Sequence, residues 1–287
     1  MMLSERSIVF PHLHLTLPEV GDHIDIFGFS IMYYGIVIAC GMLLAGAFIL
    51  HEGKRQGFQE DDLLDIILWG ILCGILGARI YYVLFSLDRY SGRWLSVFNL
   101  REGGLAIYGG IIGCLLAIIV TTRRKGLSFF AVADVMVFGG LIGQICGRWG
   151  NFFNREAFGS YTDNLFAMRL PVDAVRQPEA VTDEMQKHLL AESGIDWISV
   201  HPTFLYESLW NIGVFLILYF FVRKRKKWDG EIFFSYLLLY GAGRFWIESL
   251  RTDQLHILGT DLAVSQCLAA ICVIVSAAVL FYKKKTI

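Results

Sequence analysis

Charged residues are scarce in this chain. They make up 18% of its 287 residues, whereas a soluble domain contains about 25%. Hydrophobic residues reach 55%, and the mean hydropathy is +0.55. The low charge excludes an ordinary soluble domain and argues against nucleic acid as a partner. We therefore expect a polytopic membrane protein.

The familiar signatures of metal, disulfide and nucleotide sites are missing. All six cysteines fall inside apolar runs, and none belongs to a C-x-x-C pair. The sequence has no Gly-rich phosphate loop and no Ser/His/Asp arrangement. The first 28 residues are polar and mixed, without an apolar core beside a cleavage site, so we expect no removable signal peptide. We also expect no metal and no cofactor.

Seven apolar runs are long enough to cross about 30 Å of hydrocarbon. Such runs must be helical, because lipid offers no partners to unpaired backbone groups. The expected fold is all-α, a single integral membrane domain over residues 1–287. The expected helices lie near residues 29–50, 63–85, 105–122, 130–150, 204–222, 231–249 and 262–282.

Basic residues gather on four short connections, which follow the first, third, fifth and seventh runs. They occupy positions 54–55, 123–125, 223–227 and 283–285. Since lysine and arginine favour the cytoplasmic side, the N-terminus is expected outside and the C-terminus inside. The long insert at 151–203, which contains Pro171, Pro178 and Pro202, then faces outward as a small external head.

A polar cluster begins where the fourth run ends. Residues 130–146 carry one charge, Asp134, whereas Arg148, Asn151 and Glu156 follow within ten positions. Polar groups at the end of a membrane helix are costly and are often functional. We expect this segment to belong to a site.

Two later helices carry carboxylates close to arginine. Tyr240, Arg244 and Glu248 recur at i, i+4 and i+8, on one face of the sixth helix. Arg244 and Glu248 either satisfy each other or aim the arginine at an anion. Glu207 lies about one turn into the fifth helix and needs a partner. That partner is Arg148 or Arg244; alternatively Glu207 is protonated and only ties helices together.

Glycines flank a tyrosine at the outer start of the third helix. Gly103 and Gly104 precede Tyr108, and Gly109 and Gly110 follow it. Paired glycines allow close approach by lipid or peptide, and helix packing explains them nearly as well. Arg79, near the outer end of the second helix, is expected to snorkel towards water.

The polar inventory of arginines, carboxylates, amides and tyrosines suits a phosphate whose other end is in lipid. Arginine is the side chain for bidentate phosphate recognition. Two arginines can also stabilise the charge that develops on a departing phosphate.

These residues resemble the prolipoprotein diacylglyceryl transferase family. Residues 147–159 match its signature, Gly-Arg-x-Gly-Asn-Phe-x-Asn-x-Glu-x-x-Gly, at every specified position. The stretch from His201 to Glu207, the glycine pairs around Tyr108, and the ladder from Tyr240 to Glu248 resemble further family motifs in the same order. The resemblance covers nearly the whole chain.

The resemblance implies transfer of a diacylglyceryl group from phosphatidylglycerol to the thiol of the lipobox cysteine of a prolipoprotein. The product is a thioether, and glycerol 1-phosphate is released. It implies a multi-pass protein of the bacterial cell membrane, with membrane lipid and the signal-peptide segment as partners and the active site towards the outer leaflet.

The resemblance also implies roles for individual residues. Arg148 and Arg244 would clamp the phosphate, with Glu207 and Glu248 orienting them. Asn151 and Glu156 would shape the site. Further functional positions are expected at Tyr34, Gly103, Gly104, Gly159 and Tyr240.

One position departs from the family pattern. Some members carry a histidine, proposed as the catalytic base, where this chain has Tyr108. Tyrosine, with a pKa of about 10, is a poor base at neutral pH. His201 is the substitute candidate, although its place beside Pro202 is equally consistent with a structural role.

Two rival functions come from other classes. A secondary transporter for a small organic anion would use the same arginines, but it predicts repeated helices and broken segments, and the sequence shows neither. A non-catalytic lipid-binding or assembly protein would explain the basic groups but not so many carboxylates and amides at one depth.

Overall fold

The computed structural model describes residues 3–100, 103–257, 260 and 262–286. These residues form two compact units. One comprises Met1–Ala45 and Val137–Ile287, and the other is Gly46–Met136. The first and fourth long helices contribute to both units.

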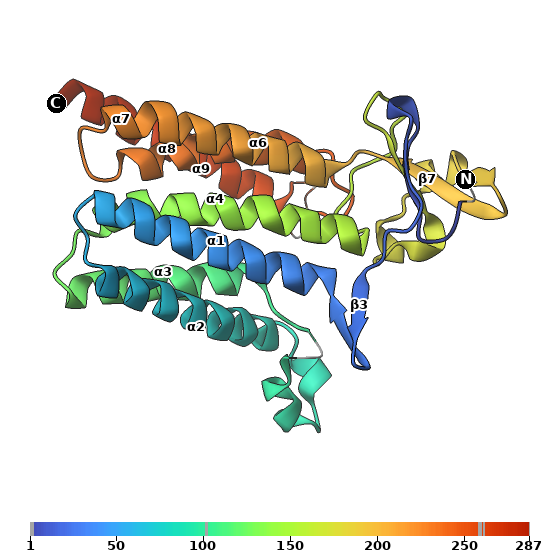
Figure 1. The fold of residues 1–287 in the computed structure, drawn as a ribbon, viewed down its shortest axis with the longest axis horizontal. Helices are drawn as coiled ribbons and strands as arrows, with labels where there is room; N and C mark the ends of the chain where they lie inside the picture. Colours follow the sequence, from blue (N-terminus) through green and yellow to red (C-terminus); the bar gives the residue numbers. More distant parts are fainter. Residues whose placement is uncertain (1–2, 101–102, 258–259, 261, 287) are drawn as a thin grey trace. The chain divides into compact units, whose positions relative to one another are not determined.

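The apolar runs of the sequence are helices, as predicted (Figure 1). Six helical stretches in the described residues are long and apolar enough to cross a membrane. They are α1 (Tyr33–Arg55), α2 (Glu60–Leu84), α3 (Ile107–Arg124), α4 (Phe129–Asn154), the stretch Thr203–Arg225 and α9 (Val264–Thr286). The stretch Thr203–Arg225 is continuous and comprises α6 (Thr203–Ile217), a π-helical turn (Leu218–Val222) and α7 (Arg223–Arg225). The chain is therefore a multi-pass membrane protein.

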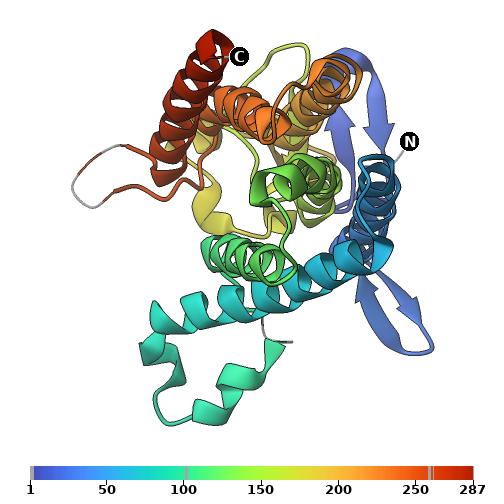
Figure 2. The same ribbon diagram turned by 90° about the vertical axis from the view of Figure 1, so that its left-hand side faces the viewer.

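The expected sixth helix is α8 (Glu231–Glu248). It carries Glu231, Arg244 and Glu248 within 18 residues, and it is not among the stretches that qualify as spans on composition. It packs against α6 and α9, which flank it in Figure 1 and in the turned view of Figure 2. Its charges therefore lie on a helix that is packed against two apolar neighbours.

The prediction of an all-α fold is wrong, because the described residues also contain two sheets. One has five strands in the order β2-β1-β5-β7-β6, and the other is the hairpin β3-β4. The strands are β1 (Ile8–Phe10), β2 (Leu15–Leu17), β3 (His23–Ile26), β4 (Phe29–Met32), β5 (Met168–Pro171), β6 (Leu190–Glu192) and β7 (Ile195–Val200). Strands of three to six residues are too short to show a clear alternation. The start expected for the first helix is also wrong, since 29–32 form β4 and α1 begins at Tyr33.

The larger sheet joins distant parts of the chain. Val9 of β1 pairs with Arg169 of β5, and Met168 pairs with Val200 of β7, all antiparallel. A buried apolar cluster lies against this sheet and includes Phe152 of α4 and Phe204 of α6. The cluster attaches the sheet to the ends of these two helices. Shorter elements of the same region are α5 (Asp183–Lys187) and 3-10 turns at Pro11–Leu13, Val172–Ala174 and Pro178–Ala180.

In the unit Gly46–Met136, α2 and α3 pack closely along their glycines (Figure 2). A side chain at Gly77 would overlap the carbonyl of Gly109, and one at Gly113 would overlap the carbonyl of Cys73. Such close approach of two backbones is what small residues in membrane helices allow. In the sequence, the segment that connects α2 to α3 contains 3-10 turns at Leu87–Tyr90 and Trp94–Phe98.

Candidate functional site

The signature segment spans the end of α4 and the turn that follows. Arg148 and Asn151 are three residues apart and therefore share one face of the helix. Past the helix end, Arg155 and Ala157 adopt left-handed backbone conformations, with φ of 48° and 55°. Such conformations are strained for residues other than glycine and persist where the surroundings impose them. The backbone of this turn is therefore held in place by the residues packed around it.

The turn directs Glu156 back towards α4. Its Oε1 accepts hydrogen bonds from Asn151 Nδ2 and Asn154 Nδ2, both at 3.0 Å. Its Oε2 lies 3.5 Å from Arg176 Nε. Asn151 also accepts from Arg148 Nη1 at 3.3 Å. Glu156 is therefore linked to Arg148 through one amide.

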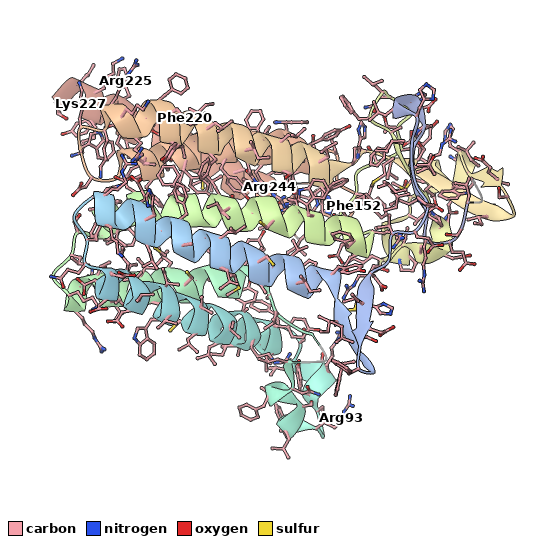
Figure 3. The ribbon with its side chains drawn as sticks, viewed as in Figure 1. Arg93, Phe152, Phe220, Arg225, Lys227 and Arg244 are labelled. Atoms are coloured by element: carbon pink, nitrogen blue, oxygen red, sulfur yellow. The ribbon has the colours of Figure 1, made fainter. Side chains whose placement is uncertain are left out.

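Glu207 of α6 lies between two arginines. Arg148 Nε is 2.9 Å from Glu207 Oε2, and Arg244 Nη1 donates to Glu207 Oε1 at 2.9 Å. Glu207 is 4% exposed, so its carboxylate is almost entirely shielded from water. The pattern predicted either arginine as the partner, and the structure provides both. Figure 3 labels Arg244, which α8 directs towards α4.

Glu248, one turn after Arg244, closes the network. Arg244 Nη2 lies 2.5 Å from Glu248 Oε2, and Ser265 of α9 donates to Glu248 Oε1 at 2.5 Å. Gln254 donates to the backbone carbonyl of Glu248. Arg244 therefore pairs within its own helix and also reaches Glu207. That Arg244 is aimed at an anion stays a prediction.

Arg251 is a member of this network that the sequence analysis did not single out. Its Nη1 lies 3.9 Å from Glu207 Oε1 and 4.0 Å from Glu248 Oε2. Asp253 holds the rest of the guanidinium, accepting from Nε at 2.9 Å and from Nη2 at 2.7 Å. The signal was the spacing of Arg251, which lies three residues after Glu248 and so about one turn past the end of α8.

The Arg251–Asp253 pair keeps both charges. Burial alone would lower the pKa of Arg251, but the hydrogen bonds to Asp253 and its charge raise it above the ordinary value. Burial alone would raise the pKa of Asp253, whereas the hydrogen bonds from Arg251 hold it below the ordinary value. Arg251 is therefore a fixed positive charge beside the two glutamates.

Gly159, at the end of the signature, lies where three segments meet. Its N–H donates to the carbonyl of His201 at 2.9 Å, and the next residue, Ser160, donates to the carbonyl of Leu250 at 2.6 Å. A Cβ at Gly159 would lie 2.7 Å from His201 Cβ and 2.9 Å from the Leu250 oxygen. Glycine is required here because there is no room for a side chain.

His201 lies between β7 and α6. Its Nδ1 is 3.3 Å from the Tyr206 hydroxyl, and burial lowers the pKa of the imidazole below the ordinary 6.5. A histidine with a lowered pKa is neutral at pH 7, which is the form that can accept a proton.

Two tyrosines named from the family resemblance lie on helices that contribute to this site. The ring of Tyr34 packs where a side chain at Gly150 would overlap it. The ring of Tyr240 stacks on Tyr236, with centroids 5.3 Å apart. Tyr236 in turn accepts a hydrogen bond from Gln144 of α4 at 2.8 Å. The tyrosines therefore fix how α1 and α8 pack on α4.

The remaining predicted residues, Tyr108, Gly103 and Gly104, belong to the unit Gly46–Met136. Gly103 and Gly104 have left-handed φ of 77°, and a Cβ at Gly104 would lie 2.6 Å from Arg79 Nη1. Tyr108 is in the first turn of α3. The structure groups these three residues with Arg79.

The expectation that Arg79 snorkels to water is wrong. Arg79 is 7% exposed, and its guanidinium donates only to backbone carbonyls of the loop that precedes α3. The acceptors in the described residues are Ser96, Val97, Asn99, Gly103 and Gly104, at 2.7 to 3.1 Å. These five bonds use the donor capacity of an arginine. Arg79 therefore holds a loop.

The arrangement around Glu207 can bind an anion. Among the described residues, Nη2 of Arg148 and Nε of Arg244 have no acceptor. Three arginines (Arg148, Arg244 and Arg251) face three carboxylates (Glu207, Glu248 and Asp253), so the cluster is close to neutral before an anion binds. Guanidinium groups held in this way present planar donors suited to a phosphate.

Comparison with protein families agrees with the signature. The model of the family described as prolipoprotein diacylglyceryl transferase matches residues 22–282. The match includes α1 to α9 up to residue 282, the strands from β3 onwards, and all the residues of the arginine network.

Similar bacterial proteins carry the name phosphatidylglycerol–prolipoprotein diacylglyceryl transferase. One from Clostridioides difficile (strain 630) is 43% identical over 230 residues, which are 80% of this chain and 82% of that protein. One from Finegoldia magna is 40% identical over 261 residues, covering 91% of this chain and 94% of that protein. One from Bacillus mycoides is 39% identical over 258 residues, covering 90% and 89%.

Proposed function

Because this chain belongs to the prolipoprotein diacylglyceryl transferase family, we propose that it transfers the diacylglyceryl group of phosphatidylglycerol to the lipobox cysteine of a prolipoprotein. The reaction forms a thioether and releases glycerol 1-phosphate. The observation that carries the proposal is the buried Glu207 shared by Arg148 and Arg244, at 2.9 Å from each. This network contains the signature arginine and lies within the matched region.

The bond changes define what the site must do. The cysteine sulfur attacks the glyceryl carbon that carries the phosphate ester, and the carbon–oxygen bond breaks. The electron pair leaves on the phosphate oxygen, while the thiol proton passes to a base. Arg148 and Arg244 neutralise the phosphate as its charge grows, which is the electrostatic stabilisation that accelerates such reactions.

The carboxylates hold the arginines ready for this task. Two guanidinium groups repel each other in an apolar setting, and the shared Glu207 offsets that repulsion before the substrate binds. Glu248 and Arg251 fix the remaining sides of Arg244 and Glu207. Arg148 and Arg244 are thus already positioned, and little reorganisation is needed when the phosphate arrives.

His201 is the proton acceptor that we assign. Burial lowers the pKa of its imidazole and so favours the neutral form, whereas tyrosine, the residue type at position 108, is ordinarily a poor base at neutral pH. Nδ1 of His201 faces the Tyr206 hydroxyl. When Nδ1 donates to that hydroxyl oxygen, Nε2 is left as the accepting nitrogen. In this assignment Tyr108 contributes binding.

The other predicted residues are assigned to substrate binding. Asn151 and Glu156 fix the side of Arg148 that faces away from Glu207. Gly159 lets the signature turn pack closely against His201 and Leu250. Tyr34 and Tyr240 support the helices that carry Arg148 and Arg244. Gly103 and Gly104, with Tyr108, form a second binding segment in the other unit.

The proposed placement has seven membrane helices, α8 included, in one integral membrane domain of the cell membrane. The N-terminus lies outside, the C-terminus in the cytoplasm, and residues 151–203 form an external head. The basic segment around Arg225 and Lys227 supports this placement, since it lies at one end of α6 and α8, away from Arg244 (Figure 3). The active site then faces the outer leaflet.

The direct test supplies purified protein with phosphatidylglycerol and a lipobox peptide. The peptide carries cysteine or serine at the acceptor position, and mass spectrometry follows both products. Addition of a diacylglyceryl mass to the cysteine peptide alone, with release of glycerol phosphate, supports the proposal. No addition by folded, lipid-supplied protein contradicts it and favours an anion transporter, for which uptake into liposomes is the assay.

A further inference from the structure

A groove runs along α2 and α3 in the unit Gly46–Met136. Its volume is about 730 Å³, within the range of sites that enclose small molecules. Gly77, Gly109 and Gly113 are at its base, where the two backbones approach each other. Larger side chains line its edges, among them Leu76 of α2 and Leu116 of α3. The glycines thus create a hollow between two rows of large side chains.

The groove has the length and polarity of a lipid site. From Gly109 to Arg124 the axis of α3 covers about 22 Å, at 1.5 Å per residue, a large part of the roughly 30 Å of hydrocarbon. Leu76 is 59% exposed and Leu116 is 56% exposed. Polar lining residues gather at one end and are Asp65, Thr121, Arg124 and Lys125. A peptide in extended form would leave its backbone groups unpaired along the apolar part.

The polar end offers one cation that has no carboxylate partner among the described residues. Lys125 is neutralised by Asp62 at 2.7 Å and by Asp65 at 2.6 Å. Arg124 also lines the groove and is exposed, and it has no carboxylate partner among the described residues. The guanidinium of Arg124 is therefore available to an anion at the place where the apolar groove ends.

We propose that this groove binds one anionic glycerophospholipid, with an acyl chain along α2 and α3 and its phosphate at Arg124. The unpaired guanidinium of Arg124 favours an anionic headgroup over a zwitterionic one, and the apolar length of the groove accommodates the acyl chain. The site shares no residue with the arginine network around Glu207. Its occupancy requires no transfer reaction, so the proposal is independent of the proposed function.

The test uses the full-length protein in nanodiscs that contain a trace of photoreactive phosphatidylserine or photoreactive phosphatidylcholine. Both probes carry the diazirine in the same acyl chain, and neither is the proposed donor. Labelled peptides are identified by mass spectrometry. Phosphatidylserine is expected to label α2 and α3 about five-fold more than phosphatidylcholine, the factor that one basic residue contributes near an anionic headgroup.

Two matched pairs of variants locate the binding. Arg124→Gln should remove the preference for phosphatidylserine, whereas Arg123→Gln, whose side chain does not line the groove, should keep it. Leu116→Trp should fill the groove and reduce labelling several-fold, whereas Leu115→Trp, exposed but outside the lining, should not.

Three results would overturn the proposal. They are equal labelling by the two lipids, equal effects of Arg123→Gln and Arg124→Gln, or equal effects of the two tryptophan variants. If Leu116→Trp does not fold, as judged by gel filtration, the arginine pair alone decides the question.

Discussion

Each unit of the chain places arginine within apolar helices, and the environments of these arginines differ. Within the described residues, Arg79 gives its hydrogen bonds to backbone carbonyls of one loop. Arg148 and Arg244 instead share the carboxylate of Glu207. Carbonyl acceptors leave the arginine charged and its donors occupied, so Arg79 can only fix a backbone. Arg148 and Arg244 share one carboxylate, so some of their N–H donors have no acceptor in the described part of the chain. These donors are available to an incoming phosphate.

The largest expected effect is a loss of turnover when Arg148 or Arg244 is replaced. Arg148→Ala and Arg244→Ala should each lower turnover at least about 100-fold, because each removes a donor to the developing phosphate charge. The lipobox-peptide assay measures this, with Arg123→Ala as the exposed control that should retain activity. Full activity in either variant, with normal insertion in the membrane, would remove the clamp assignment.

Glu207→Gln should lower the stability of the protein, because the two arginines depend on this carboxylate. Loss of the buried carboxylate leaves two arginines facing each other and should reduce the free energy of unfolding by about 3 kcal/mol. Added glycerol phosphate should raise the thermal midpoint of this variant more than that of the parent, because the anion replaces the carboxylate. An equal rise in both proteins would show that the arginines do not bind the anion there.

Arg79→Lys should have a smaller effect and a different signature. Lysine has three donors in place of five and lacks the planar fork, so hydrogen exchange at residues 96–100 should accelerate about ten-fold while turnover falls only a few-fold. Arg89→Lys is the matched control, since Arg89 is exposed and donates to the Tyr82 hydroxyl. Unchanged exchange in Arg79→Lys would contradict the loop-holding role.

The smallest expected effect concerns pH. Burial lowers the pKa of His201 below 6.5, so between that lowered value and 6.5 the unfolded chain binds a proton that the folded chain does not. Stability should therefore fall as the pH drops below 6.5. Histidine-labelled protein compared with His201→Asn by NMR gives the midpoint directly, and a value at or above 6.5 would contradict the assignment of His201 as a neutral acceptor.

The long helices were predictable because their physical cause is local. Apolar runs in lipid must satisfy their own backbone groups, and α2 begins and ends within three residues of the prediction. The sheet was not predictable in this way. β1 pairs with β5 across about 160 residues of sequence, and strands of three or four residues lack a readable period.

The site shows the same division. The pairing of Glu207 with arginine followed from the cost of a buried carboxylate, so the sequence indicated it. The link from Glu156 to Arg176 depends on how the insert folds, and the pattern gave no sign of it. The role of Arg79 was not predictable, because its five acceptors are backbone carbonyls. Every residue has a backbone carbonyl, so the sequence does not indicate which carbonyls accept these hydrogen bonds.

The central claim is that Arg148 and Arg244 act as one clamp through Glu207. A double-mutant cycle on turnover tests it most directly, with Arg148→Lys, Arg244→Lys and the double variant measured in the lipobox-peptide assay. The prediction is that the double variant loses at least about five-fold less activity than the product of the two single losses, as expected for residues in one network. A loss equal to that product, as expected for Arg148→Lys combined with Arg79→Lys, would show that the two arginines act independently and would contradict the clamp.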